Sequence, residues 1–158
     1  MTKFSHLNKR SQPSIVDVGK KDITRRTATA RCVLALPEEV LKELQKDNFK
    51  TKKGSVFQTA IIAGIMAAKK TGELIPLCHP LGLENCDVDI ELNGRQDIVI
   101  YCTANIEAKT GVEMEALTGA SIAALTVYDM CKGLSHDIVI KETKLIKKTG
   151  GKHDFTRE

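Results

Sequence analysis

Apolar and polar residues alternate along much of the chain in two rhythms, one typical of strands and one of helices. Residues 86–92 show the strand rhythm most clearly, since Val88, Ile90 and Leu92 fall on one face and acidic residues on the other. Residues 56–70 show the helical rhythm, because their apolar positions recur every three or four residues. Strands are predicted at 28–36, 86–92, 98–107 and 138–148. Helices are predicted to begin at Pro37 and to span 56–70 and 112–132.

The order of these predicted elements defines a fold class. A strand is followed by two helices, two strands, a helix and a last strand, which is the split βαβ arrangement of ferredoxin-like folds. We therefore expect an α+β fold with an antiparallel sheet and helices packed on one of its faces. We expect a single ferredoxin-like domain at 28–148, an N-terminal arm at 1–27 and a flexible Gly/Lys tail at 149–158.

Capping and turn residues punctuate this order. Ser55 is predicted to cap the second helix, and Gly133 to end the third. Asn93-Gly94 predicts a hairpin turn, which the polar residues up to Asp97 would lengthen. Residues 73–80 contain two prolines and are predicted to form a rigid extended loop.

Composition excludes several classes of protein. The chain has 158 residues, enough for one domain with its own core, and 42% of them are hydrophobic, as in ordinary globular proteins. The longest strongly apolar stretch, 59–68, is too short to span a bilayer, and residues 1–10 lack the apolar core of a signal peptide. The five cysteines form no CxxC pair, which favours reduced thiols over a disulfide framework. We therefore expect a cytoplasmic protein that has no membrane partner.

The net charge of +4 is small, but the lysines gather at the edges of predicted elements. These clusters are Lys52–Lys53, Lys69–Lys70 and Lys147–Lys148–Lys152. They suit a polyanionic small molecule or nucleic acid, although solvated surface lysines give the same pattern. Lys53 also stands just before a predicted helix, where free backbone N–H groups and a cation can bind an anion.

Asp129 and Lys132 form an i, i+3 pair on one face of the helix predicted at 112–132. An exposed ion pair is the plain interpretation of this spacing. Two features favour a proton-transfer pair instead: the neighbours are apolar, and at the C-terminal end the helix dipole raises the pKa of the carboxyl. Glu115 opens the same helix, with about 21 Å of helix between it and Asp129. One small reaction centre cannot use both from a single chain, so either the ligand is long or the site is shared between subunits.

Cys78 and His79, between two prolines, are candidate metal ligands. Tetrahedral zinc needs four ligands, however, and no second Cys/His pair stands at a suitable spacing. A rigidly held His79 that bonds a ligand or a phosphate fits these residues better, so no metal site is predicted.

Two segments read LIPLCHPL at 74–81 and TGVEMEALT at 110–118. Further segments stand at 16–18, 61–70, 128–132 and 148–152. In these segments, and in their order, the chain resembles the MoaC family of cyclic pyranopterin monophosphate synthases. The resemblance runs from residue 6 to residue 155. It implies a ferredoxin-like subunit in a homohexamer, a trimer of dimers with active sites at subunit interfaces.

The resemblance also implies an activity, that of a lyase in molybdenum cofactor biosynthesis. Its substrate is a cyclised GTP, 3′,8-cyclo-7,8-dihydroguanosine 5′-triphosphate, which is converted to cyclic pyranopterin monophosphate with release of diphosphate. Asp129 and Lys132 are expected to carry the acid–base chemistry, since repeated proton transfers suit a lysine of lowered pKa beside a carboxylate. No cofactor is implied beyond Mg²⁺ that could accompany the triphosphate.

The same resemblance assigns further residues to substrate binding. Those expected to line the site or contact the ligand are Lys53, Leu77, Cys78, His79, Glu113, Met114 and Glu115. Arg26, Lys69 and Lys148 are expected to hold the triphosphate.

Two other functions are compatible with the residues. A nucleic-acid-binding module of ferredoxin-like fold would use the same lysines, but such modules carry aromatics on the sheet, where the inner strands here offer only Tyr101. No nucleic-acid partner is therefore expected. A regulatory nucleotide-binding protein without turnover would share the anion sites and would not need Lys132. Replacing Lys132 with alanine separates these hypotheses.

Overall fold

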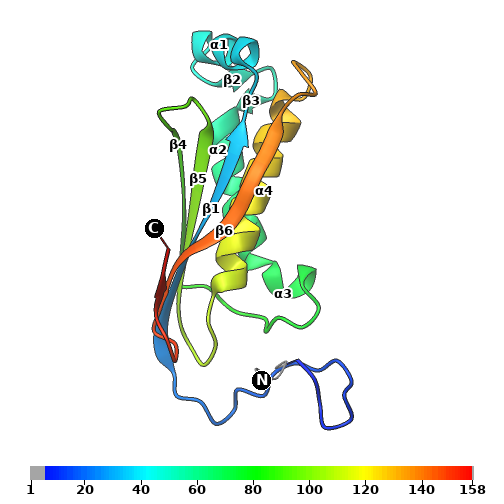
Figure 1. The fold of residues 1–158 in the computed structure, drawn as a ribbon, viewed down its shortest axis with the longest axis vertical. Helices are drawn as coiled ribbons and strands as arrows, with labels where there is room; N and C mark the ends of the chain where they lie inside the picture. The colour runs from blue at the N-terminus through cyan, green and yellow to red at the C-terminus, as the bar shows by residue number, and fades with distance from the viewer. Residues whose placement is uncertain (1–5, 158) are drawn as a thin grey trace.

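The computed structural model describes residues 6–157. Its five main strands are β1 (Thr24–Ala35), β4 (Asn85–Leu92), β5 (Ile98–Ala108), β6 (Val139–Thr149) and β7 (Phe155–Thr156). They form one antiparallel sheet in the order β4–β5–β1–β6–β7 (Figure 1). The order of the first four strands in this row is that of a split βαβ fold, so the predicted ferredoxin-like α+β class is confirmed.

Two long helices, α2 (Val56–Lys69) and α4 (Glu113–Cys131), pack against each other on one face of this sheet and run in opposite directions (Figure 1). Two short helices, α1 (Glu38–Lys46) and α3 (Thr71–Leu74), stand at opposite ends of the molecule. A small hairpin of β2 (Lys50–Thr51) and β3 (Gly54–Ser55) lies beside α1. Within residues 6–157, no helix packs on the other face of the sheet.

The core between the sheet and the long helices is built largely from small side chains. From Ala28 onward, every second residue of β1 is fully buried, at Ala28, Ala30, Cys32 and Leu34. Helix α4 contributes fully buried alanines to the same cluster, at Ala116, Ala120, Ala123 and Ala124. Because α4 is fixed along its length by this packing, the side chains at its two ends are held in defined places.

The two long helices approach each other most closely at a pair of glycines. A methyl group added at Gly64 would lie 2.9 Å from the carbonyl oxygen of Gly119. One added at Gly119 would lie 2.5 Å from the Cys102 sulfur and 3.1 Å from the carbonyl oxygen of Gly64. These positions therefore require glycine, because any side chain would force α4 away from both α2 and the sheet.

Replacing Gly119 with alanine is expected to destabilise the protein by about 1–3 kcal/mol, the usual cost of overpacking a core. The measurement is the urea midpoint and slope of equilibrium unfolding. Gly82→Ala is the matched control, since nothing lies within 4 Å of the added methyl group, and it should stay near the wild type. Equal midpoints for the two variants would contradict the tight helix contact.

Strand boundaries differ from the sequence prediction at both ends of the domain. Strand β1 begins at Thr24 rather than at residue 28, because its partner β5 continues far enough for Thr24 to pair with Ala108. Residues 24–27 therefore lie in the sheet and not in the arm. At the other end, β7 pairs with β6 within the segment that the sequence analysis treats as a flexible tail.

The segment at 73–80 is extended in only part of its length. The prediction of an extended loop is wrong for residues 75–78, a turn in which the N–H of Cys78 donates to the carbonyl of Ile75 at 3.0 Å, and for Glu73 and Leu74. Both belong to α3, where the backbone N–H of Leu74 donates to the carbonyl of Lys70. The buried Thr71 starts this extra turn, since its hydroxyl donates to the carbonyl of Ala68 at 2.9 Å. The sequence prediction missed this turn because a contact with the end of α2 stabilises it.

Other local predictions are confirmed. The hydroxyl of Ser55 accepts a hydrogen bond from the N–H of Gln58 and caps α2. The hairpin loop reaches Asp97, because Asn93 Oδ1 accepts from the N–H groups of Arg95 and Asp97, each at 2.9 Å. In the part of the chain that the structure describes, no helix combines the length and apolar character needed to cross a membrane.

Candidate active site

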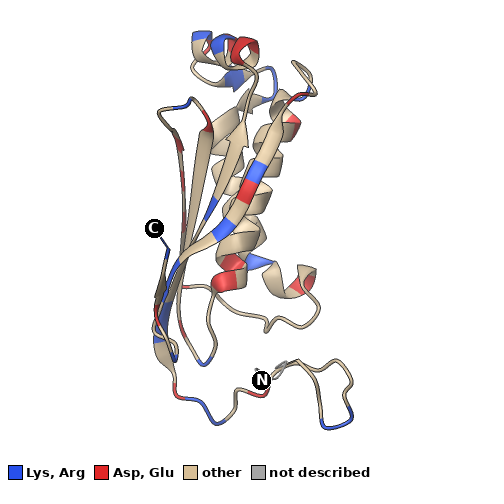
Figure 2. Ribbon diagram, in the orientation of Figure 1, with Lys and Arg blue, Asp and Glu red and all other residues tan. Residues whose placement is uncertain are grey.

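The residues proposed for catalysis and those proposed for binding lie mostly at opposite ends of α4. Asp129 and Lys132 stand at its C-terminal end, close to the β2–β3 hairpin, while Glu113 and Glu115 stand at its N-terminal end. Figure 2 shows the acidic residues at the lower end of this helix. About 21 Å of helix separates Glu115 from Asp129, as the sequence predicts.

At the C-terminal end, Lys53, Asp129 and Lys132 form a lysine–aspartate cluster. Asp129 Oδ1 lies 2.7 Å from Lys132 Nζ, and Asp129 Oδ2 lies 3.1 Å from Lys53 Nζ. The Lys53 ammonium also donates to the backbone carbonyl of Asp129 at 3.2 Å. Lys53 reaches the helix because it sits in the turn of the β2–β3 hairpin, which Gly54 closes with a φ of 113°.

The charges of this cluster correct two sequence predictions. Hydrogen bonds from Lys132 and Lys53 lower the pKa of Asp129, whereas the helix dipole alone was predicted to raise it. The hydrogen bond to Asp129 raises the pKa of Lys132, whereas a lowered value was predicted. Two full charges within 3.1 Å outweigh the partial charge of a helix end. Since all three side chains are more than half exposed, burial opposes these two shifts only weakly in the isolated chain.

At the N-terminal end of α4, side chains from four segments surround a cavity of about 440 Å³, which we call the Glu115 hollow. Six of the predicted substrate-binding residues line it: Leu77, Cys78, His79, Glu113, Met114 and Glu115. The loop after α3 and the first turn of α4 supply these six residues. The N-terminal arm supplies four more, His6, Val16, Val18 and Lys21, which the sequence analysis did not assign to the site.

Glu115 is the buried acid of this hollow. It is only 3% exposed, and burial raises the pKa of its carboxyl, with a smaller contribution from the nearby Glu113. Glu113 itself is paired with Lys148, whose Nζ lies 3.0 Å from Oε1. The two glutamates therefore differ in character: Glu115 binds a proton more readily than usual, and Glu113 is held in an ion pair.

Burial also raises the pKa of the Cys78 thiol, so this residue suits contact with a ligand better than nucleophilic attack.

Replacing Glu115 with glutamine is expected to change how stability depends on pH. The folded-state pKa of Glu115 is raised above the unfolded value of about 4.3, so the folded protein binds this proton more tightly. Its contribution to stability is fully present below the unfolded pKa and is lost as the pH rises through the folded-state pKa. The unfolding free energy of the wild type minus that of the variant should therefore be larger at about pH 4 than at about pH 7.5.

Urea unfolding of the wild type and Glu115→Gln at both pH values measures this difference. Glu84→Gln, a change at an exposed glutamate just before β4, serves as the control. A difference in unfolding free energy between wild type and Glu115→Gln that stays constant with pH would contradict the raised pKa of Glu115.

His79 is held by a contact that the sequence did not predict. Its Nε2 lies 2.8 Å from the carbonyl oxygen of Val16, in the N-terminal arm. Because a carbonyl only accepts hydrogen bonds, Nε2 carries the hydrogen in this contact. His79 thus joins the proline-rich loop to the arm at the rim of the Glu115 hollow.

A second cavity of about 240 Å³, which we call the basic hollow, adjoins the first. Five of the residues that line it are cations: Lys21, Arg26, Lys109, Lys148 and Lys152. Glu113 is the one acid among its lining residues within 6–157. The two hollows share five lining residues: Lys21, Thr110, Gly111, Glu113 and Lys148. Lys and Arg are seen to gather at this end of the sheet in Figure 2.

The structure thus places the three residues predicted to hold a triphosphate in two different positions. Arg26 and Lys148 line the basic hollow, whereas Lys69 is exposed at the end of α2 and lines neither hollow. Lys21 and Lys109 line the basic hollow and were missed. Their sequence signals were weak: Lys21 lies in an irregular arm, and Lys109 comes directly before the TGVEMEALT segment.

Cys78 and His79 belong to no metal cluster that the structure describes. Across residues 6–157, no group of three or more His, Cys, Asp or Glu side chains is arranged to hold a metal ion. The five cysteines are free thiols.

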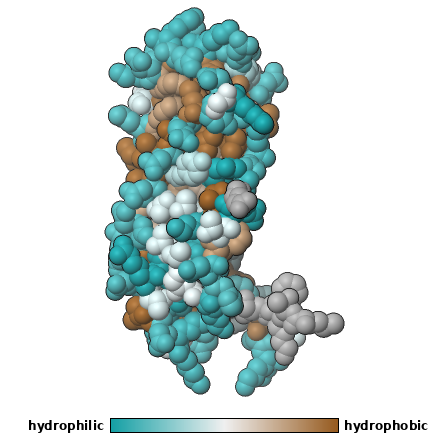
Figure 3. All heavy atoms as spheres, turned by 60° about the vertical axis from the view of Figure 1, so that its left-hand side comes forward, coloured by the Kyte–Doolittle hydropathy of each residue, from teal (hydrophilic) through white to brown (hydrophobic). Residues whose placement is uncertain are grey.

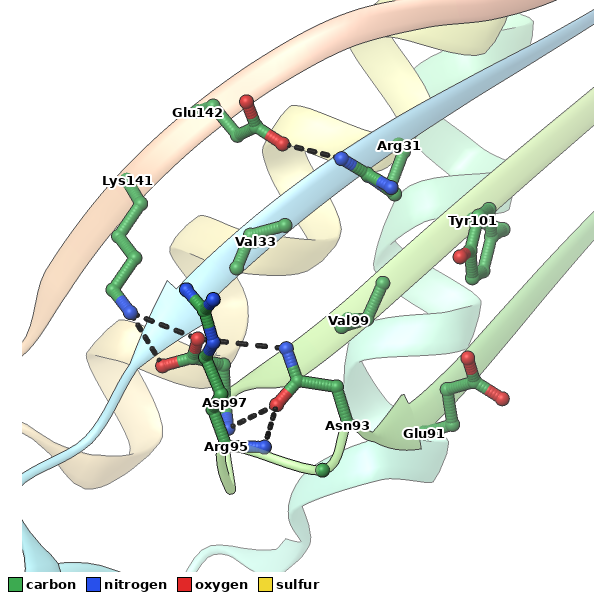
Figure 4. Close-up of a pocket in the computed structure, with 11 residues that line it drawn as sticks. Arg31, Val33, Glu91, Asn93, Arg95, Asp97, Val99, Tyr101, Lys141 and Glu142 are labelled. Atoms are coloured by element: carbon green, nitrogen blue, oxygen red, sulfur yellow. Dashed lines mark hydrogen bonds and ion pairs between the residues drawn. The ribbon is translucent and has the colours of Figure 1, made fainter. Parts of the chain in front are cut away.

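A cavity of about 600 Å³, larger than either hollow, lies on the helix-free face of the sheet, away from the predicted site residues (Figure 4). Four of its six charged side chains pair with one another: Arg31 with Glu142 at 2.6 Å, and Lys141 with Asp97 at 2.7 Å. Figure 3 turns the side that is on the left in Figure 1 forward and shows a hydrophobic patch framed by hydrophilic side chains. Since as many acids as cations line this cavity, the basic hollow is the better site for a polyanion.

Comparisons with known proteins show the family of the chain. The model of the MoaC family matches residues 15–151. The chain is 49% identical over 153 residues to a cyclic pyranopterin monophosphate synthase of Xanthomonas campestris pv. campestris (strain 8004), an alignment that covers 97% of this chain and 93% of that protein. It is 48% identical over 155 residues to a protein of the same name from Lysinibacillus sphaericus (strain C3-41), with 96% of each chain covered. It also aligns, with 49% identity over 98% of its length, to 46% of a molybdenum cofactor biosynthesis bifunctional protein of Synechocystis sp. (strain ATCC 27184 / PCC 6803 / Kazusa).

Proposed function

Because the chain belongs to the MoaC family, we propose that it acts as a cyclic pyranopterin monophosphate synthase, a lyase of molybdenum cofactor biosynthesis. In this reaction 3′,8-cyclo-7,8-dihydroguanosine 5′-triphosphate is converted to cyclic pyranopterin monophosphate, and diphosphate leaves. The observation that best supports this activity is the direct junction of the Glu115 hollow and the basic hollow. The Glu115 hollow would bind the rings and hold the groups that transfer protons, and the basic hollow would bind the phosphates.

The basic hollow is the proposed binding site for the triphosphate. Its five cations face a single acid, so a chain of phosphates is attracted to it and held. Forming the cyclic phosphate expels diphosphate, and positively charged groups around that leaving group stabilise the charge that develops on it. Arg26 and Lys148 fit this task directly, since both line the hollow.

The Glu115 hollow is the proposed site for the guanine-derived rings. Leu77, Cys78 and Met114 offer weakly polar surface for ring contact, and His79 stands beside them. Because its pKa is raised, the Glu115 carboxyl keeps its proton to a higher pH than an ordinary glutamate, which suits it to exchange a proton with a ring nitrogen. Glu113, held by Lys148, lies where the two hollows meet and can orient the substrate between them.

The acid–base residues Asp129 and Lys132 are proposed to come from a second subunit. They are too far along α4 to reach the Glu115 hollow of their own chain, since about 21 Å of helix intervenes. A homohexamer, a trimer of dimers with sites at its interfaces, brings the lysine–aspartate cluster of one subunit to the hollows of its neighbour. Contact with that neighbour would remove water from Lys132 and so lower its pKa, which the isolated chain does not do.

We further propose a cytoplasmic location, which the five free thiols support. The cations of the basic hollow are proposed to supply the charge that the reaction needs, with no resident cofactor. Any Mg²⁺ would enter with the triphosphate.

Turnover by the purified full chain tests the proposed function. The cyclised GTP substrate is added, and diphosphate and cyclic pyranopterin monophosphate are measured together, with GTP itself as the control substrate. Native mass spectrometry of the same sample gives the number of subunits. Binding of the cyclised substrate with no diphosphate released would instead indicate a nucleotide-binding protein without turnover.

A further inference from the structure

The N-terminal arm is laid along the Glu115 hollow in an ordered way. Ser14, Val16 and Val18 are half-buried, while the residues between them are exposed, so one side of this extended segment faces the body of the protein. Val16 and Val18 line the hollow. In Figure 1 this blue segment runs past the loop that follows α3.

Two side chains of the body hold this segment by its backbone. His79 contacts the carbonyl oxygen of Val16 at 2.8 Å, and the ammonium of Lys109 donates to the carbonyl oxygen of Gly19 at 2.7 Å. Lys109 follows directly after β5, so it anchors the arm to the end of a central strand of the sheet. Both contacts are directed at main-chain atoms and therefore fix the path of the arm.

At residues 17–21, around the Gly19 contact, the arm forms a tight turn. Asp17 Oδ1 accepts from the N–H of Gly19 at 2.8 Å, and the N–H of Lys21 donates to the carbonyl of Val18 at 3.0 Å. The turn places Lys21 where it lines both the Glu115 hollow and the basic hollow. Lys21 is therefore the cation of the arm that stands at the junction of the two cavities.

We propose that Lys109 is a positioning residue for substrate binding: it fastens the turn at residues 17–21 so that Lys21 stands at the junction of the two hollows. The proposal rests on the proposed function, in which the triphosphate occupies the basic hollow. Lys109 also lines that hollow, so direct contact with phosphate is the competing role. The two roles differ in the substrate-free protein, where only the positioning role affects the arm.

Hydrogen exchange of the substrate-free full chain tests the positioning role. In Lys109→Met, peptides covering residues 14–21 are expected to exchange about tenfold faster, the equivalent of losing one hydrogen bond to a charged donor. Lys109→Arg keeps a cationic donor and should restore slow exchange. Lys46→Met, which removes an exposed lysine on α1, should leave the arm unchanged.

Steady-state kinetics with the cyclised substrate completes the test. Lys109→Met and Lys21→Met are each expected to raise KM about tenfold with kcat within about twofold, because one hydrogen bond to a charged partner is lost outside the reacting atoms. Their double variant should be little worse than either single one, since both remove the same contribution.

Each result decides the matter. Unchanged exchange in Lys109→Met overturns the proposal whatever KM does, and a raised KM would then assign Lys109 to direct phosphate contact. Faster hydrogen exchange with an unchanged KM would also overturn it, because the contact between Lys109 and Gly19 would then be only structural. A wild-type protein without turnover would refute the proposed function, while the exchange data would still show whether Lys109 holds the arm.

Discussion

Replacing Lys132 with alanine is expected to lower kcat for diphosphate release by about 10²–10⁴-fold, the usual contribution of a positioned acid–base group. The fold should be unaffected, because the Lys132 side chain is 52% exposed and forms an ion pair with Asp129, one turn away on the same helix. The measurement is single-turnover release of diphosphate from the cyclised substrate, with circular dichroism and native mass as checks on structure.

Lys42→Ala is a matched control for this change. Lys42 is also an exposed helical lysine paired with an acid one turn away, Glu38, but it lies on α1. It should retain wild-type turnover. If Lys132→Ala kept the wild-type rate of diphosphate release, the assignment of Lys132 to the chemistry would be wrong, and the salt bridge to Asp129 would be only structural.

Mixing two inactive variants is expected to restore activity if the active site is shared. Lys132→Ala damages the lysine–aspartate cluster, and Glu115→Gln damages the Glu115 hollow, so each homo-oligomer should be inactive. In a mixed dimer with two sites, one site combines both intact halves and the other combines both damaged halves. Random mixing of equal amounts should therefore restore about a quarter of the wild-type activity.

Co-expression with two different affinity tags provides the mixed oligomers for this test. The control pairs Lys132→Ala with Asp129→Asn, two changes within the same cluster, which should restore nothing. Mixed oligomers of Lys132→Ala and Glu115→Gln that carry both tags and stay inactive would contradict a site shared between subunits. The exposure of the lysine–aspartate cluster in the isolated chain is the structural reason to expect recovery.

The elements of the fold were predictable where their signals are local. The cap by Ser55, the period of α2 and the alternation in β4 are set by neighbouring residues, and the structure places these elements close to the predicted boundaries. Short elements were not predictable, because two or four residues are stabilised only by what they pack against. Helix α3 depends on Thr71 bonding the end of α2, and the β2–β3 hairpin is likewise too short to signal itself in the sequence.

The sequence by itself determined which residue types are available for chemistry and how far apart they lie along α4. Helix geometry alone places Asp129 and Lys132 on one face and puts a long stretch of helix between Glu115 and Asp129. The electrostatics needed the tertiary structure as well. The largest cause of the lowered pKa of Asp129 is the hydrogen bond from Lys132 on the same helix; the fold added a second one from Lys53, in a distant hairpin, and it buried Glu115. Burial and charge depend on groups far away in the chain, and a local pattern carries no information about such contacts.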